Sequence, residues 1–311
     1  MSLIPNIEQG EILKKDELIR GFLCCPVCHG ELNINEKQAT CMTCETCYPI
    51  AENVMILSPT TTSEFDKMLL GRYEVTSGGS PFSVSKIAKK MLGDVKGKTI
   101  LDVGCSQGKF AFQNILPYEP NVVIGVDFAA GAIRIAQQHA HSFSNALFVV
   151  GDAMALPIKS DKFDCVVITE VIEHLPNVDS CLAELRRVVK KDGLIILSTP
   201  NYFNVVGIFK RLFDHFYFKG RERWTYALHD EELEHFQTPF SVQQKLSQAG
   251  LQILDFRGSD FWQGISKAII VPWLLIDYMV RKIEQRISLG ILTKSFLKYF
   301  GVVQYYRLQK E

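Results

Sequence analysis

Five short apolar runs alternate with helical stretches between residues 98 and 200, and no other feature of this 311-residue sequence restricts the fold as much. The runs are 99–103, 122–126, 146–150, 163–168 and 194–197. They are rich in Val, Ile and Leu and almost uninterrupted, as strands are when both faces of a parallel sheet are covered. Stretches such as 129–139 and 179–190 separate them, the second with apolar residues at helical spacing. The pattern predicts a doubly wound α/β sheet that binds its ligand at the carboxyl ends of the strands.

A glycine-rich turn follows the first run, in Leu101-Asp102-Val103-Gly104-Cys105-Ser106-Gln107-Gly108-Lys109-Phe110. The backbone of such a turn can approach a ligand closely. A dinucleotide fingerprint needs glycine at its third and sixth positions, where this chain has Ser106 and Lys109. A phosphate-binding P-loop needs four residues between its glycines, whereas three separate Gly104 from Gly108. Neither of these two motifs fits the turn.

Acidic side chains follow the next two predicted strands, Asp127 in Gly125-Val126-Asp127-Phe128 and Asp152 in Gly151-Asp152-Ala153-Met154. A carboxylate at the tip of the second strand can accept hydrogen bonds from both hydroxyls of a ribose. In the alternative interpretation, Asp127 and Asp152 only cap helices or turns.

The form Asp-x-Gly-x-x-x-Gly, with these acids in register, resembles the class I S-adenosylmethionine-dependent methyltransferases. Two later motifs, Glu170-Val171-Ile172-Glu173-His174 and Ser198-Thr199-Pro200-Asn201, are most similar to small-molecule O-methyltransferases of the ubiquinone-pathway type. The resemblance covers about 160 residues. Ser106 stands where many members of the family have a second glycine.

This resemblance implies a mostly parallel, seven-stranded, Rossmann-like α/β sheet closed by an antiparallel strand, here 302–308. It also implies S-adenosylmethionine as the cofactor, with Asp127 on the ribose and Asp152 at the adenine amino group. The full set of cofactor-binding residues that it implies is Asp102, Gly104, Ser106, Gly108, Asp127, Phe128, Asp152, Ala153 and Glu170.

Methyl transfer to a hydroxyl needs a base, and histidine is suited to that role near neutral pH. The candidate catalytic residues are His174 and His235, with His229 as a further candidate base. In the alternative, His235 only fixes its loop and His174 only packs against the adenosyl group. Glu173 could orient a histidine or ligate an ion, but we expect it at a solvated helix start.

Six of the nine cysteines lie between residues 24 and 47, and four have the spacing Cys25-x2-Cys28-x12-Cys41-x2-Cys44. Two such pairs can aim four thiolates at one ion in the tetrahedral geometry that Zn²⁺ prefers. Free thiols or a redox pair are the alternative. Cys24 and Cys47 are surplus, and Cys47 could replace Cys44 as a ligand.

The cysteine segment, with Tyr48-Pro49-Ile50 after it, resembles the zinc-ribbon family of small proteins that partner tRNA and protein methyltransferases. The resemblance favours Cys25, Cys28, Cys41 and Cys44 as ligands of a structural zinc. Glu52-Asn53 stands where the family usually has Asp-Gly. We therefore expect a zinc-ribbon domain at 1–58 and a methyltransferase domain at 59–311 with insertions at 202–234 and 262–300.

Charge separates two enzyme functions. The net charge is zero, and residues 1–58 carry four basic and eight acidic residues. Some bacterial rRNA guanine-N1 methyltransferases join a zinc ribbon to this fold, so an rRNA or tRNA methyltransferase is the alternative to a methyltransferase for a small-molecule, glycan- or lipid-linked acceptor. An RNA-facing ribbon should be basic, which makes nucleic acid an unfavoured partner. A non-catalytic scaffold is disfavoured because Asp102, Gly104, Asp127 and Asp152 are intact.

The sequence shows no signal peptide, and its longest apolar run, 268–276, is too short to span a membrane, which needs about twenty residues. We expect a cytoplasmic protein. Trp262 and Trp273, followed by Arg281, Lys282 and Arg286, are typical of an element at a membrane surface, so peripheral membrane contact is a further prediction. The favoured alternative for this segment is a helix buried against the catalytic domain or a dimer partner. For both aromatic insertions we expect an acceptor cover or an oligomer contact, here a homodimer.

Overall fold

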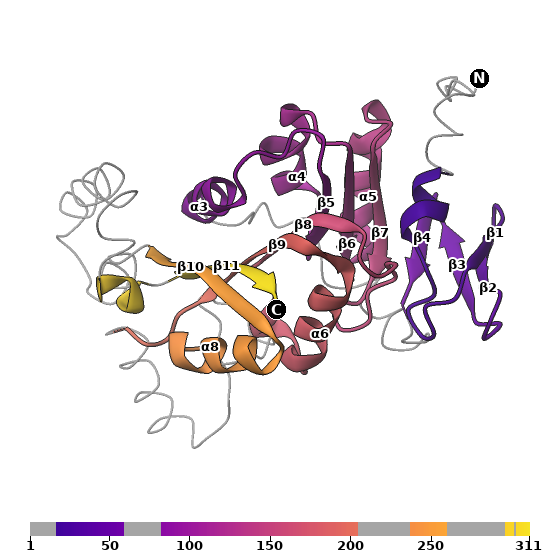
Figure 1. Cartoon of the computed structure of the whole chain (residues 1–311). Coiled ribbons are helices and arrows are strands. Elements are labelled where there is room, and N and C mark those ends of the chain that lie inside the picture. The colour runs from indigo at the N-terminus through magenta and orange to yellow at the C-terminus, as the bar shows by residue number, and fades with distance from the viewer. Residues whose placement is uncertain (1–16, 59–81, 205–236, 260–295, 302) are drawn as a thin grey trace, which may run out of the picture. The chain divides into compact units, whose positions relative to one another are not determined.

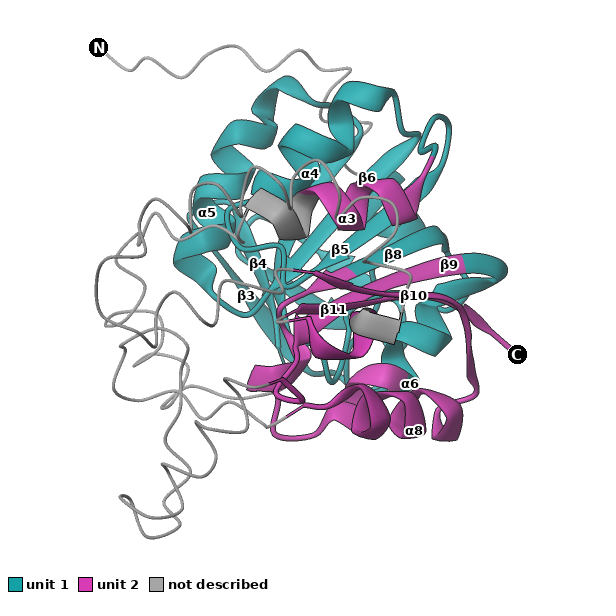
Figure 2. Ribbon diagram, turned by 90° about the vertical axis from the view of Figure 1, so that its left-hand side faces the viewer, with its two compact units in different colours: residues 1–79, 94–167, 183–193 teal, residues 80–93, 168–182, 194–311 magenta. Residues whose placement is uncertain are grey.

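The computed structural model describes residues 17–58, 82–204, 237–259, 296–301 and 303–311 (Figure 1). The chain forms two compact units, which Figure 2 colours teal and magenta. Unit 1 consists of Met1–Gly79, Asp94–Val167 and Ala183–Gly193. Unit 2 consists of Ser80–Gly93, Ile168–Leu182 and Leu194–Glu311.

The centre of unit 1 is a set of parallel strands, β5 (Thr99–Val103), β6 (Val122–Asp127) and β7 (Ala146–Gly151). β6 pairs with both neighbours, with Leu101 opposite Ile124 and Ile124 opposite Leu147. Every residue of these strands is buried, because apolar side chains project from both faces of the sheet. The predicted runs at 99–103, 122–126 and 146–150 are confirmed as strands.

Short helices connect the strands of unit 1. They are α4 (Lys109–Asn114), the 3-10 turns η1 (Leu116–Tyr118) and η2 (Ala140–Ser142), and α5 (Ala130–His139). α5 buries Ala130, Ala132, Ile133 and Ala136, which recur at helical spacing. The strand–helix alternation read from the sequence is therefore present in this unit.

The cysteine segment extends the same sheet. After helical residues 17–22, four strands follow in succession: β1 (Leu32–Ile34), β2 (Gln38–Cys41), β3 (Cys47–Ala51) and β4 (Val54–Leu57). They pair antiparallel with one another, and β4 then pairs in parallel with β7, so that the order in this unit is β1-β2-β3-β4-β7-β6-β5 (Figure 1). The segment thus contributes a strand to the edge of the core sheet.

Unit 2 contains the C-terminal antiparallel strands. β11 (Val303–Lys310) pairs antiparallel with β9 (Val189–Pro200) on one side and with β10 (Leu251–Ser259) on the other. The expected closing strand at 302–308 is confirmed as antiparallel. The described helices that lie wholly in unit 2 are α3 (Phe82–Leu92), the 3-10 turns η3 (Ile172–His174) and η5 (Phe296–Phe300), and α8 (Pro239–Gln248). Thr238 and Ser241 form a capping box at the start of α8.

Three elements contribute residues to both units: β8 (Phe163–Thr169), α6 (Val178–Val188) and β9. The sequence predicted a helix over 179–190, but α6 ends at Val188 and the next two residues begin β9. The predicted end of the helix was wrong because two consecutive valines fit an apolar helix face and a buried strand equally well.

Within the described part of the chain, no helix combines the length and the apolar character needed to cross a bilayer. The segment that motivated the membrane-surface prediction, 261–280, lies outside the described residues, so that prediction stays open.

Candidate cofactor site and metal centre

The glycine-rich turn after β5 uses the left-handed backbone conformation three times. Gly104, Ser106 and Gly108 have φ angles of 70°, 50° and 74°. A side chain at Gly108 would place its Cβ 2.6 Å from Cε2 of Phe112, so glycine is required there. Ser106 therefore stands at a position with a left-handed conformation, which glycine adopts without steric cost.

Asp127 ends β6 and holds this turn. Its Oδ2 accepts a hydrogen bond of 2.8 Å from the backbone N–H of Ser106, and its Oδ1 accepts one of 2.9 Å from that of Ala129. The side chain is buried, and burial raises its pKa although these N–H donors act against the rise. Asp127 is thus a turn cap, as the alternative interpretation held, but each carboxylate oxygen keeps a second lone pair for a ligand.

Asp102 lies one residue before the end of β5 and carries an unusual carboxyl group. It is 2% exposed, and in the described part of the chain its Oδ2 is buried with no hydrogen-bond partner. Burial, reinforced by the negative charge of Asp127, raises the pKa of Asp102 to about 7. A buried carboxylate oxygen without a partner is the kind of group that a cationic or hydrogen-bonding ligand satisfies.

Asp152 and Phe128 follow the ends of the two neighbouring strands. Because Asp127 lies opposite Val150 in the parallel β6–β7 pair, Asp152 emerges at the same carboxyl end of these strands as Asp127. Its Oδ1 accepts a hydrogen bond of 2.8 Å from the N–H of Met154, and Ala153 lies within this turn. Phe128 is 42% exposed and follows the end of β6.

In unit 2, two glutamates are bound by hydroxyls of β9. Oε1 of Glu170, which has a φ of 55°, accepts a hydrogen bond of 2.8 Å from Ser198, and Oε2 of Glu173 accepts one of 2.9 Å from Thr199. Glu173 is 1% exposed, so the expectation of a solvated helix start was wrong. The hydroxyl of Thr199 makes the burial of Glu173 tolerable. The sequence gives no indication that Ser198 and Thr199 face these two glutamates.

His174 follows Glu173, and its side chain is 38% exposed, with Nε2 at 3.9 Å from Oε1 of Glu173. The other candidate bases, His229 and His235, lie outside the described residues, as do most of the insertions at 202–234 and 262–300.

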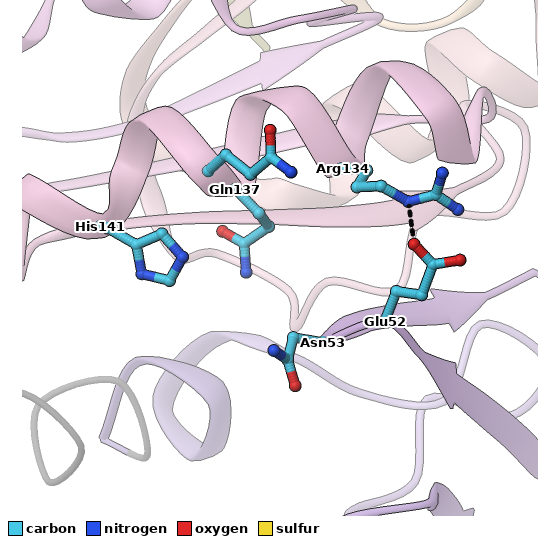
Figure 3. Close-up of a pocket in the computed structure, with 6 residues that line it drawn as sticks. Glu52, Asn53, Arg134, Gln137 and His141 are labelled. Carbon is cyan, nitrogen blue, oxygen red and sulfur yellow. Dashed lines mark ion pairs between the residues drawn. The ribbon is translucent and has the colours of Figure 1, made fainter. Parts of the chain in front are cut away.

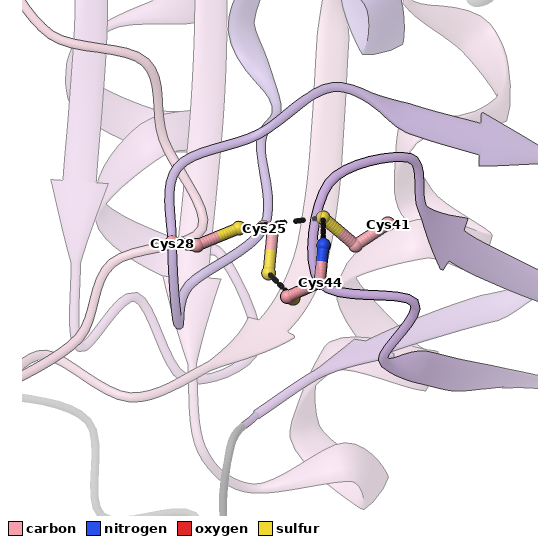
Figure 4. A group of neighbouring side chains, drawn as sticks. All are labelled: Cys25, Cys28, Cys41 and Cys44. Carbon is pink, nitrogen blue, oxygen red and sulfur yellow. Dashed lines mark hydrogen bonds between the residues drawn. The ribbon is translucent and has the colours of Figure 1, made fainter.

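The four cysteines singled out by their spacing come together in unit 1 (Figure 4). Their sulfur atoms all lie within 4.8 Å of one another, with 3.6 Å between Cys25 and Cys44 and 3.4 Å between Cys28 and Cys41. Tetrahedral Zn²⁺ with Zn–S bonds of about 2.3 Å requires sulfur–sulfur separations of about 3.8 Å. The donor set and its dimensions therefore fit a zinc ion. The cluster does not include Cys24 or Cys47.

Local backbone geometry explains why these thiols converge. The residues after each pair, His29 and Glu45, have φ angles of 58° and 60°, and their N–H groups donate to the carbonyls of Cys25 and Cys41. The buried hydroxyl of Tyr48 lies 3.1 Å from the sulfur of Cys25. Tyr48 is a supporting residue that the sequence pattern of cysteines alone does not reveal.

A small cavity of about 210 Å³ lies between the β3–β4 turn and α5, outside the predicted site residues (Figure 3). It is lined by Glu52, Asn53, Arg134, Gln137, Gln138 and His141. Glu52 and Asn53 have φ angles of 51° and 63°, and Oε2 of Glu52 lies 2.8 Å from Nε of Arg134. Glu52 and Asn53, which stand where the zinc-ribbon resemblance would place Asp-Gly, thus form a strained turn, and Glu52 joins this turn to α5 through Arg134.

Parallel strands that end in a glycine-rich turn and in acids at one edge define a Rossmann-like, cofactor-binding α/β protein. A family model described as "Methyltransferase domain" matches residues 94–251, just over half of the chain. The chain belongs to this methyltransferase family.

Among its relatives, the ubiquinone biosynthesis O-methyltransferase of Glaesserella parasuis is 32% identical over 130 residues, which are 39% of this chain and 53% of that protein. The chain spans about half the length of the curated relatives it matches.

Two solved structures share the fold. A putative S-adenosylmethionine-dependent methyltransferase from Listeria monocytogenes is 16% identical with a TM-score of 0.52, covering 73% of this chain and 96% of that one. The complex between the Haloferax volcanii Trm112 methyltransferase activator and the putative methyltransferase gives a TM-score of 0.51 at 14% identity, covering 73% and 88%. At these identities the likeness shows the fold alone.

Proposed function

We propose that this chain is an S-adenosylmethionine-dependent methyltransferase, with a ribbon at 1–58 joined to a catalytic domain at 59–311. The observation that carries the proposal is Asp102, a buried carboxyl group with one oxygen that has no partner among the described residues, beside a turn whose backbone adopts the left-handed conformation. Family membership supports the same activity.

The cofactor-binding roles follow from the chemistry of each group. Asp127 would accept hydrogen bonds from the ribose hydroxyls, Asp152 would accept one from the adenine amino group, and Phe128 would cover the base. The turn through Gly104, Ser106 and Gly108 would let the backbone approach the methionine part, with Ala153 lining the adenine side and Glu170 contributing from the later motif. Asp102 would balance a positive charge of the cofactor.

S-adenosylmethionine supplies an activated methyl group on a sulfonium. The protein therefore has to orient the acceptor and, for a hydroxyl, remove its proton. His174 is half-exposed and lies beside the buried Glu173, so it is a suitable base. We propose His174 in this role, with His235 as the second candidate.

We propose a small-molecule acceptor with a hydroxyl group, because the relative from Glaesserella parasuis is named for O-methylation in ubiquinone biosynthesis. Amine and glycan- or lipid-linked acceptors belong to the same proposal.

The ribbon would hold one structural zinc through Cys25, Cys28, Cys41 and Cys44. Four thiolates close the coordination sphere, so the metal would stabilise the ribbon and leave no position for a substrate.

The activity is tested by isothermal titration with S-adenosylmethionine, followed by incubation with methyl-labelled cofactor and a panel of catechol and quinol compounds. We expect saturable one-to-one binding and label in at least one phenolic ether, identified by mass spectrometry. The absence of cofactor binding to folded protein would refute the proposal.

A further inference from the structure

The segment that follows β7, residues 152–160, lies between the ribbon and α6, and it begins with Asp152, a proposed cofactor residue. Resting on the function proposed above, we propose that the ribbon is a metal-dependent brace for the 152–160 loop. Metal held by the four cysteines would thereby raise the affinity of the chain for S-adenosylmethionine.

Backbone hydrogen bonds join the ribbon to the end of this loop. The N–H of Cys24 donates to the carbonyl of Pro157 at 3.1 Å, and the N–H of Lys159 donates to the carbonyl of Phe22 at 2.8 Å. Between these bonds, Leu23 forms an antiparallel bridge with Ile158, and both side chains are fully buried. The loop is thus paired with the ribbon as a short two-stranded ladder.

The ammonium group of Lys159 adds a polar contact to the ladder. It donates to the carbonyl of Arg20 at 2.8 Å and pairs with Oε1 of Glu31 at 2.6 Å. The lysine side chain is 21% exposed and the glutamate side chain 65% exposed, so solvent reaches the pair mainly from the Glu31 side.

The opposite side of the loop is held by two residues of α6. Oε2 of Glu184 accepts a hydrogen bond of 2.7 Å from the N–H of Leu156, and the guanidinium of Arg187 donates to the carbonyls of Leu156 and Ile158. Since α6 fixes only this side, loss of the ribbon would remove the contacts that hold the loop on its other side.

The strand β4 reaches the start of the loop as well. Its last residue, Leu57, lies opposite Gly151, the residue that precedes Asp152. The ribbon therefore contacts the chain on both sides of the 152–155 turn, immediately before Asp152 and at Pro157.

The metal site is continuous with these contacts. Cys25, one of the four thiols, directly follows Cys24, whose N–H binds Pro157, and Cys41 ends β2 in the same small sheet. A ribbon of this size has too little core to stay ordered without its metal, so metal loss would release the ladder. Coupling between two sites of this kind is commonly five- to 150-fold, or about 1–3 kcal/mol.

The test compares the dissociation constant for S-adenosylmethionine in metal-loaded protein, in protein stripped with a chelator, and in stripped protein reloaded with Zn²⁺. We expect stripping to weaken binding at least about fivefold and reloading to restore it. Hydrogen exchange, measured without cofactor, should show faster exchange of the amides in 152–160 after stripping, with β5 and β6 unchanged.

The variant Lys159→Met tests the same brace with the metal in place. We expect weaker cofactor binding by at least about threefold at unchanged zinc content. Lys96→Met is the matched control, because Lys96 forms an exposed pair with Glu119 in the same unit, away from the loop, and its loss should leave binding unchanged.

Equal cofactor affinity in loaded and stripped protein would overturn the proposal and leave the methyltransferase function intact. If neither form binds the cofactor, the proposed function fails, and hydrogen exchange then decides the brace on its own. Unchanged protection of 152–160 after metal removal would overturn it.

Discussion

Oδ2 of Asp127 accepts a hydrogen bond of 2.8 Å from the backbone N–H of Ser106, which joins the tip of β6 to the glycine-rich turn after β5. The acid thus shapes the turn and lies at the edge where a nucleoside would bind. A substitution at Asp127 therefore tests both roles.

We expect Asp127→Ala to weaken S-adenosylmethionine binding at least about tenfold, because two ribose hydroxyls would lose a charged partner worth about 2–4 kcal/mol. Isothermal titration measures the affinity, and zinc content should not change. Asp94→Ala is the matched control, since Asp94 caps the N–H of Lys96 in an exposed turn. Unaltered affinity in Asp127→Ala would contradict the assignment of this residue.

Asp102→Asn should change how stability depends on pH. The folded-state pKa of Asp102, about 7, lies above its ordinary value of 3.8, so the folded state holds this proton more tightly than the unfolded state. The wild type therefore loses stability as pH rises from about 4 to about 7, by up to about 4 kcal/mol, and stays at the lower level above that range. Asp102→Asn should lose this component, which urea unfolding at a series of pH values would show. Identical pH profiles would exclude a raised pKa.

The metal centre can be dissected by single thiol changes. Purified wild type should contain about one zinc per chain, and Cys44→Ser should lose most of it because three thiols bind zinc much more weakly. Cys47→Ser should retain the metal, since Cys47 is exposed on β3 and outside the sulfur cluster. Elemental analysis measures the zinc content of the wild type and of both variants. Less than about half a zinc per wild-type chain would exclude the four-thiol site.

Thr199→Val should destabilise the protein by about 1–3 kcal/mol, because it removes the hydroxyl that binds the buried Oε2 of Glu173. Thr199→Ser keeps the hydroxyl and should lose less than about 1.5 kcal/mol. Denaturant unfolding followed by circular dichroism measures both. A larger loss in Thr199→Ser than in Thr199→Val would show that methyl packing matters more than the hydrogen bond at this position.

The Glu52 turn allows a strain effect to be separated from a charge effect. Glu52→Ala loses the pair with Arg134 and keeps a side chain at a φ of 51°, so it should lose about 0.5–1 kcal/mol. Glu52→Gly loses the same pair but relieves the strain by about 1 kcal/mol and should be close to wild type. Thermal unfolding compares the two, and a less stable glycine variant would contradict strain at this turn.

Much of the fold could be predicted because its signals are local. Continuous Val, Ile and Leu runs identified β5, β6 and β7, and the Cys-x2-Cys spacing selected the four thiols that cluster. The boundary between α6 and β9 was missed, since Val188 and Val189 suit either structure and strand pairing decides.

Some features of the candidate site could likewise be predicted from the sequence, and others could not. Asp127 and Asp152 follow predicted strand ends and Asp102 lies one residue before such an end, so the parallel arrangement places all three at the carboxyl ends of the strands. The burial of Glu173 could not be predicted from the sequence, because it depends on a hydrogen bond from Thr199, 26 residues later in the chain. The position of β9 in the fold brings that hydroxyl to Glu173.

By itself, the sequence determined the class of fold, the glycine-rich turn and the thiol set, since each depends on residue types at fixed short spacing. Only the tertiary structure decided that the cysteine segment becomes part of the core sheet. That outcome rests on the pairing of Leu57 with Gly151 and of Leu23 with Ile158, which are 94 and 135 positions apart in the sequence. Strand pairing at that separation depends on the edge that β7 leaves open, and no local pattern records which edge a distant strand will occupy.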